Sequence, residues 1–325
     1  MAVVIDRRLS VAPMMDWTDR HCRYFHRILA PNALLYTEMV TTGALLYGDV
    51  QRHLQFNTEE HPVALQLGGS EPEAMAACAK LAQGWGYDEV NINVGCPSER
   101  VQSGAFGACL MAEPQTVADC VKAMKDVVDI PVTVKTRIGI DDMDDYQNLF
   151  EFTAAMIAAD CDSLTVHARK AWLKGLSPKE NRDIPPLDYP AVYRLKTDYP
   201  ELEVTINGGI TQTTAVHEHM QQSDGVMIGR EAYQNPFWLF ELQRELFDPA
   251  FMLTRQQVVK AMLPYIESQL SRGGALKYIT RHMLGLFQSV PGAKRWRRHL
   301  SENAYKEGAG VELVQEAAAM VPEHF

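Results

Sequence analysis

The sequence predicts an α/β protein: a (β/α)8 TIM barrel followed by a small all-α helical-bundle domain. Eight short runs rich in β-branched residues alternate with longer helix-like stretches over roughly the first 250 residues, which is typical of this barrel. Five of these runs also carry a polar side chain at or next to their last residue. A doubly wound sheet would alternate similarly but usually has fewer strands. The expected strands are Leu9–Ala12, Leu34–Tyr36, Val63–Leu67, Val90–Val94, Val132–Lys135, Ser163–His167, Val204–Asn207 and Gly225–Ile228.

Side-chain parity within these strands indicates which residues face the barrel axis. Because neighbouring side chains on a strand point to opposite faces, residues two apart share a face. The apolar set of each strand is expected to pack outward on the helices, and the alternate set to point inward. Barrel enzymes place their active sites at the carboxyl ends of the strands. The inward residues at those ends are Gln66, Asn93, Lys135, His167 and Asn207.

The stretches between the strands carry helical periodicity. Met75, Cys78 and Leu81 form one apolar stripe in the stretch after Ser70. Ser70 and Glu73 stand three residues apart before that stripe, so we expect a capping box at its start.

A domain boundary is expected near residue 247, which gives a barrel domain at 1–247 and a helical domain at 248–325. Val258, Met262 and Ile266 keep helical spacing beyond that point, without strand-like alternation. Pro264 should kink this helix or shift its boundary.

Charge is unevenly distributed in this acidic chain, whose net charge is −10. Between Arg272 and Arg298 there are seven basic residues and no acidic one, so the rest of the chain is more acidic than the whole. Such a segment favours contact with nucleic acid, although a solvated basic helix face would have the same composition.

Composition narrows the class of protein further. No apolar run is long enough for a transmembrane helix, and the N-terminus lacks the order of regions of a signal peptide, so we expect a cytoplasmic protein. The six cysteines include no C-x-x-C pair, and we expect them to be reduced and to bind no metal.

Glycines follow the last two expected strands, at Gly208-Gly209 and at Gly229, before Arg230. Loops at these positions form the recurrent phosphate site of such barrels, because glycine lets backbone N–H groups approach an anion. Two tight turns with a surface arginine are the alternative reading.

Lys135 points into the expected barrel, where an ammonium needs an anionic or electron-rich partner. A flavin satisfies this need, since a nearby cation stabilises the charge that its N1–C2=O region gains on reduction. Gln66 could hydrogen-bond to the ring edge, and Pro13 and Met14 could pack on the ring. A Schiff-base lysine remains the alternative.

Cys96 lies on a loop between glycine and proline, just past the fourth expected strand. A free thiol keeps its proton at neutral pH, which suits a general acid that protonates carbon. A loop cysteine without a role is the alternative.

The stretch after the sixth expected strand is rich in cations and should overhang the barrel mouth. Its side chains could contact phosphates or a base, or they could belong to a solvated loop. The cations are Arg169, Lys170, Lys174, Lys179 and Arg182.

The motifs together resemble the tRNA-dihydrouridine synthase family over almost the whole chain. The most specific is Asn-Val-Gly-Cys-Pro-Ser at 93–98, followed by Gly-Ala-Phe-Gly-Ala at 104–108. The others are Ala-Pro-Met at 12–14, Val-Lys-Thr-Arg-Ile-Gly at 134–139, His-Ala-Arg at 167–169, Asn-Gly-Gly at 207–209 and the run from Gly225 to Arg230.

The resemblance implies that the chain reduces uridine in the tRNA D-loop, at positions 20 and 20a, with FMN reloaded by NADPH. Cys96 would protonate C5 while the flavin N5 gives hydride to C6. The residues implied for tRNA or the flipped base are Asn93, Arg169, Lys179, Arg182, Arg295 and Arg298. Those implied for FMN are Pro13, Met14, Met15, Gln66, Lys135, His167, Asn207, Gly208, Gly209, Gly229 and Arg230.

Partners follow from the same resemblance: tRNA, contacted at its D-loop and elbow, with the protein acting as a monomer away from any membrane. The closest rival is a dihydroorotate- or dihydropyrimidine-type FMN enzyme acting on free pyrimidines. It would share Lys135 and Cys96 but would not need the helical domain or its basic segment. A tRNA-binding module on an inactive barrel is a second rival, and it would be colourless.

Overall fold

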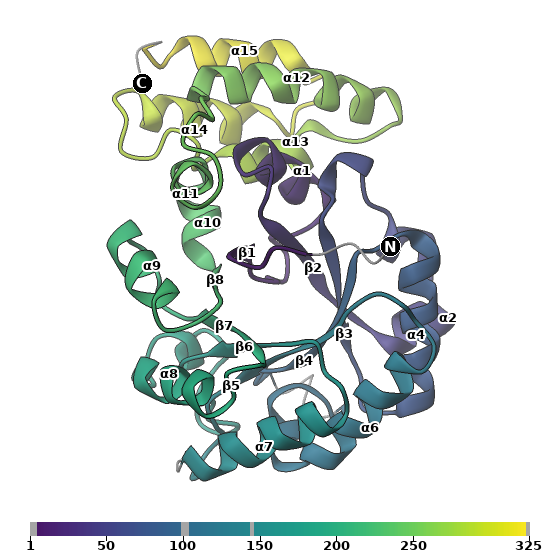
Figure 1. Ribbon diagram of the computed structural model, residues 1–325. Helices are drawn as coiled ribbons and strands as arrows, with labels where there is room; N and C mark the ends of the chain where they lie inside the picture. The colour runs from purple at the N-terminus through teal and green to yellow at the C-terminus, as the bar shows by residue number, and fades with distance from the viewer. Residues whose placement is uncertain (1–4, 99–103, 144–145, 323–325) are drawn as a thin grey trace. The chain divides into compact units, whose positions relative to one another are not determined.

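The structure, a computed structural model that describes residues 5–98, 104–143 and 146–322, contains a closed barrel of eight parallel strands (Figure 1). The strands follow one another around the barrel in chain order, and β8 closes on β1. This confirms the predicted fold class. The strands are β1 Leu9–Val11, β2 Leu34–Thr41, β3 Val63–Gly68, β4 Glu89–Val94, β5 Val132–Arg137, β6 Ser163–His167, β7 Glu203–Asn207 and β8 Gly225–Ile228.

Helices connect the strands, as the periodicity predicted. The barrel unit holds α2 Thr42–Tyr47, α3 Val50–Leu54, α4 Pro72–Trp85, α6 Pro114–Lys125, α7 Tyr146–Ala158, α8 Tyr189–Asp198 and α9 Thr213–Met220. It also holds the 3-10 helices η1 Thr58–Glu60, η2 Gly107–Ala112 and η3 Glu180–Arg182.

The capping box predicted at Ser70 and Glu73 is wrong. Helix α4 begins at Pro72 with Glu71 at the N-cap, and that cap makes no side-chain hydrogen bond. Proline at the first helical position has its φ already set for a helix and has no N–H to satisfy, so the start moves to Pro72.

A chain of side-chain hydrogen bonds crosses the barrel interior from β3 to β5. Gln66 Nε2 donates to Asn91 Oδ1 at 2.8 Å, and Asn91 Nδ2 donates to Thr133 Oγ1 at 2.9 Å. Thr133 Oγ1 then donates to Glu89 Oε1 at 2.6 Å. All four residues are buried and their side chains bond to one another, so they lie on the same face of the sheet, as the alternation predicted for Gln66, Asn91 and Thr133.

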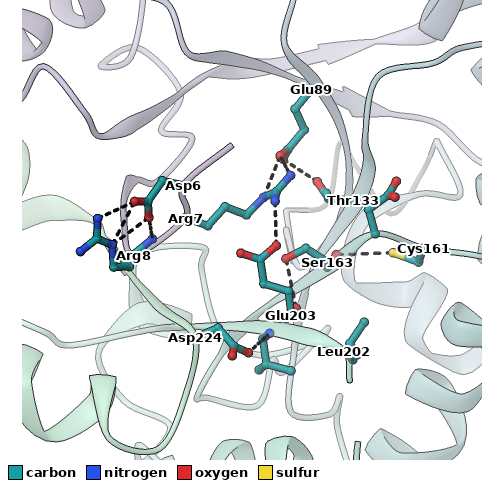
Figure 2. Close-up of polar contacts among 12 residues, drawn as sticks. Asp6, Arg7, Arg8, Glu89, Thr133, Cys161, Ser163, Leu202, Glu203 and Asp224 are labelled. Carbon is teal, nitrogen blue, oxygen red and sulfur yellow. Dashed lines mark hydrogen bonds and ion pairs between the residues drawn. The ribbon is translucent and has the colours of Figure 1, made fainter. Parts of the chain in front are cut away.

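A buried ion pair fills the barrel near the start of β4 (Figure 2). Arg7 Nε donates to Glu89 Oε2 at 2.9 Å, and Arg7 Nη1 pairs with Glu203 at 2.7 Å. The Tyr36 hydroxyl donates to Glu89 Oε1 at 2.7 Å. Burial raises the pKa of the Tyr36 phenol, and the neighbouring Glu89 carboxylate raises it further. Because this cluster lies at the amino ends of the strands, we assign it to stability and not to chemistry.

Contacts divide the chain into a barrel unit, residues 1–15 and 34–229, and a helical unit, residues 16–33 and 230–325. The helical unit holds α1 Arg20–Leu29, α10 Arg230–Gln234, α11 Trp238–Leu246, α12 Arg255–Ser271, α13 Leu276–Met283, α14 Ala293–Asn303 and α15 Val311–Ala319. The functional boundary at 247/248 stays a prediction. Helix α12 runs through Pro264 as one helix, so that proline does not shift the helix boundary.

The N-terminus of α1 joins the helical unit through Asp19. This N-cap carboxylate accepts from the backbone N–H groups of His21 and Cys22, from Arg281 Nη2 at 2.6 Å and from His282 Nε2 at 3.0 Å. Burial raises the pKa of Asp19, but these donors outweigh it and hold the pKa well below its usual range.

Candidate active site

The loop that carries Cys96 is fixed by hydrogen bonds on both sides of the cysteine. Asn93 Oδ1 accepts from the backbone nitrogens of Gly95 at 3.2 Å and Cys96 at 3.0 Å. The Cys96 carbonyl accepts from Ala108 N at 2.9 Å. Since Asn93 is the last inward-facing residue of β4, the turn is anchored directly to the barrel wall. Cys96 itself is half-buried, and its Sγ lies 3.6 Å from Ser98 Oγ.

Arg137 completes this anchoring, and the sequence analysis assigned it no role. Its Nε donates to the Gly95 carbonyl at 2.8 Å, and its Nη1 donates at 3.0 Å to the carbonyls of Lys170 and Asn181. The side chain is 3% exposed. Strand β5 runs two residues beyond Lys135, so extending the alternation from Thr133 and Lys135 would have placed Arg137 on the same inward face.

Lys135 is the group at this site that most requires a ligand. Within the described part of the chain its ammonium makes no hydrogen bond or ion pair. The pKa of Lys135 is lowered to about 7, first by burial and then by the charge of Arg137, while Cys96 acts in the opposite direction. A partly buried cation without a partner is costly, so an anionic group placed beside it would be stabilised.

Two of the other predicted cations, Arg169 and Arg182, lie close enough to Arg137 for their charges to affect its pKa. Its pKa is lowered to about 10, chiefly by burial; Arg182 and Arg169 lower it further, and Cys96 raises it. The structure therefore brings Cys96, Lys135, Arg169 and Arg182 to one mouth of the barrel, together with a guanidinium that the prediction did not include.

The Gly208-Gly209 turn after β7 requires glycine at both positions. The two φ angles are +119° and +67°, in the left-handed region. A Cβ on Gly208 would lie 2.6 Å from the His167 ring, and one on Gly209 would lie 2.6 Å from Leu187 Cδ1. The Tyr189 hydroxyl donates to the Gly208 carbonyl at 2.7 Å. His167 and this turn are therefore packed together at the end of neighbouring strands.

The remaining residues predicted for FMN occupy the ends of β1, β3, β7 and β8. Gln66 is 1% exposed, and its amide is already bonded to Asn91 and Asn93. Asn207 Nδ2 donates to the Met227 carbonyl at 2.7 Å. Pro13 and Met14 are half-buried after β1 and Met15 is exposed, while a Cβ at Gly229 would meet no heavy atom within 4 Å. Arg230 is the first residue of α10, in the helical unit.

In the loop after β6, one predicted cation bonds to the backbone of the loop and two others are exposed. Arg169 Nη1 donates to the carbonyls of Asp183 and Pro185, so this side chain shapes the loop. Lys179 and Arg182 are exposed. These two remain candidates for direct contact with substrate.

Two basic residues of the segment from Arg272 to Arg298 form ion pairs with acidic residues from outside it. Arg281 is paired with Asp19, and Arg298 is paired with Glu302 at 2.8 Å. Arg295 and Arg298 are exposed on α14, whose opposite face buries Trp296 and Leu300. Both arginines belong to the helical unit.

Among residues 5–98, 104–143 and 146–322, no three His, Cys, Asp or Glu side chains gather as metal ligands. No helix in the same ranges has the length and apolarity required to span a membrane.

The chain is 62% identical over 318 residues to the tRNA-dihydrouridine(20/20a) synthase of Vibrio vulnificus (strain CMCP6), covering 97% of each chain. It is 60% identical over 324 residues to the protein of that name from Escherichia coli (strain K12), covering 97% of this chain and 92% of the relative.

Solved structures share the fold at low identity. The old yellow enzyme homologue of Zymomonas mobilis matches with a TM-score of 0.54 and 13% identity, over 76% of this chain and 90% of that one. Morphinone reductase matches with a TM-score of 0.51 and 13% identity, over 73% and 86%. The model of the dihydrouridine synthase (Dus) family matches residues 10–321, and the chain therefore belongs to the dihydrouridine synthase family.

Proposed function

We propose that this protein is a flavin-dependent tRNA-dihydrouridine synthase that reduces uridine to 5,6-dihydrouridine in the tRNA D-loop, at positions 20 and 20a. Family membership and the names of relatives that are about 60% identical support the reaction and its substrate. The observation that carries the site assignment is the half-buried Cys96, held on a fixed turn near Lys135, whose ammonium has no partner among the described residues.

The residues at the barrel mouth suit FMN. Lys135 offers a cation without a partner, and the left-handed Gly208-Gly209 turn lets backbone groups approach a phosphate. His167, Asn207 and Gly229 line the same strand ends, and Arg230 follows directly in the chain. Pro13, Met14, Met15 and Gln66 would complete the ring site from β1 and β3.

When bound, reduced FMN supplies the hydride that reaches C6 of the uracil. Cys96 then gives its thiol proton to C5, and the bonds from Asn93, Ala108 and Arg137 to its turn keep the sulfur from drifting away from that carbon. Lys135 would hold the flavin at its N1–C2=O edge and would stabilise the negative charge which that edge carries in the reduced cofactor. NADPH is the proposed reductant of the cofactor.

The substrate base must leave its stack before it can enter a barrel mouth. Lys179 and Arg182 are exposed next to that mouth and would contact the flipped nucleotide, as would Asn93 through the amide hydrogen that Gln66 does not use. Arg169 would act there mainly by shaping its loop. Arg295 and Arg298 would contact phosphates of the tRNA elbow. We propose that the protein works as a cytoplasmic monomer without a metal ion.

Incubation of the purified protein with NADPH and unmodified tRNA tests the proposal. Mass spectrometry of nuclease fragments should detect a gain of two hydrogens on D-loop uridines. Unchanged fragments from a yellow, folded protein that consumes NADPH would contradict tRNA as the substrate and favour a free pyrimidine.

A further inference from the structure

The loop between β6 and α8 is organised around one buried amide, that of Asn181. This residue lies in η3 and is 0% exposed, although its neighbours Glu180 and Arg182 are exposed. A fully buried amide must satisfy both its oxygen and its nitrogen inside the protein. We propose that Asn181 is a positioning residue for the RNA substrate, an inference that rests on the proposed function.

Four hydrogen bonds tie the Asn181 side chain to the backbone of its own loop. Its Oδ1 accepts from Trp172 N at 2.7 Å, and its Nδ2 donates to the Trp172 carbonyl at 2.9 Å. The same nitrogen lies 3.2 Å from the Leu176 carbonyl and 3.3 Å from the Ser177 carbonyl. One side chain therefore fixes both polar backbone groups of Trp172 and two carbonyls further along.

A second set of bonds stiffens the segment that leads to Asn181. Ser177 N donates to Glu180 Oε2 at 2.8 Å, and Glu180 N donates to Ser177 Oγ at 3.2 Å. This reciprocal pattern defines a turn with Lys179 in its middle. Lys179 and Arg182 thus project from a segment whose backbone is held at Ser177, Glu180 and Asn181.

Arg137 connects this loop to the turn of the candidate acid. Its Nη1 donates to the Asn181 carbonyl, while its Nε donates to the Gly95 carbonyl next to Cys96. The planar Arg137 guanidinium therefore bridges the backbone next to Arg182 and the backbone next to Cys96. A shift of the loop would move the nucleotide contacts relative to the thiol, which is why Asn181 should act on substrate placement.

Steady-state kinetics of Asn181→Ala and of the isosteric Asn181→Asp test this role. We expect the KM for tRNA to rise about ten- to hundredfold in both variants, because misplaced contacts weaken substrate positioning. Flavin content and NADPH oxidation by oxygen without tRNA should match wild type. Gln147→Ala is the matched control, since its exposed amide bonds only to Glu151 among the described contacts.

A double-mutant cycle separates positioning from general destabilisation. If Asn181 acts by presenting Lys179 and Arg182, Asn181→Ala should add little to the KM defect of Lys179→Ala/Arg182→Ala. Additive defects would overturn the proposal. Loss of flavin in both Asn181 variants would also overturn it, because Asn181 would then support the barrel as a whole.

Limited digestion with trypsin provides a readout that does not need tRNA activity. Cleavage after Lys174, Lys179 and Arg182 should be about tenfold faster in Asn181→Ala than in wild type, because the released loop opens more often. Equal cleavage rates would contradict the loop role even if tRNA reduction is confirmed. If wild type forms no dihydrouridine but Asn181→Ala is still digested faster than wild type, the proposed function alone is contradicted.

Discussion

Asn93 Oδ1 lies 3.0 Å from the backbone nitrogen of Cys96 and 3.2 Å from that of Gly95, so one strand-end amide sets the turn that presents the thiol. Asn93→Ala should lower kcat about ten- to hundredfold, because the sulfur loses its fixed position. Asn93→Asp keeps the acceptor for both N–H groups and should recover part of kcat. Measurement of kcat and KM with saturating NADPH distinguishes this role from a base contact, which would mainly raise KM.

Cys96→Ala should retain the yellow cofactor and lose about 10²- to 10⁴-fold in turnover, the range that general acid catalysis contributes. Reduction of the flavin by NADPH should continue at the wild-type rate, which stopped-flow absorbance measures. Cys109→Ala is the matched control, since this half-buried cysteine of η2 bonds to the Phe106 carbonyl and has no proposed role. Normal tRNA reduction by the Cys96 variant would overturn the acid assignment.

FMN binding to the flavin-free protein should weaken as the pH rises above about 7. Burial lowers the pKa of Lys135 to about 7, and an adjacent electron-rich cofactor edge would raise it. Affinity is therefore full below pH 7 and falls by up to tenfold per pH unit until the pKa of the bound state is reached. Fluorescence titrations from about pH 7 to 9 measure this. Lys135→Ala should bind weakly with no such slope, and a flat wild-type profile would contradict the placement of the cofactor.

Glu89→Ala should lower the free energy of unfolding by about 3–5 kcal/mol, because it leaves Arg7 buried without its main partner. Urea unfolding measures the loss. Asp6→Ala, which breaks the exposed pair with Arg8, should cost less than about 1 kcal/mol. The folded Glu89→Ala protein should keep its kcat, since the cluster lies away from the barrel mouth; a large loss of kcat would mean that this cluster serves the chemistry.

Strand alternation predicted the inward face because a period of two fixes each side chain once a single residue is placed. It missed Arg137 because the fifth expected strand ended two residues too early, and it missed Glu89 because the fourth expected strand began one residue too late. Both lay two residues from inward positions already identified, Lys135 and Asn91. The bonds of Asn181 were beyond sequence reasoning, since they join its side chain to backbone groups whose positions depend on the folded loop.

The basic face of α14 should give tRNA binding a measurable salt dependence. Arg295→Ala should reduce the slope of log affinity against log salt by about 0.7–1, the value for one phosphate contact. Filter binding over a range of potassium chloride concentrations measures the slope. Arg194→Ala, an exposed arginine of α8 paired with Asp198, is the matched control. An unchanged slope for Arg295→Ala would remove this residue from the tRNA interface.

The central claim is that this barrel mouth reduces uridine in tRNA with electrons held on its own flavin. Anaerobic single turnover tests it most directly: protein reduced beforehand and freed of NADPH is mixed with unmodified tRNA while flavin absorbance is recorded. The account predicts reoxidation of the flavin with one dihydrouridine formed in the D-loop for each flavin oxidised. Flavin that stays reduced, or that reoxidises without any gain of hydrogen in the tRNA, would contradict it.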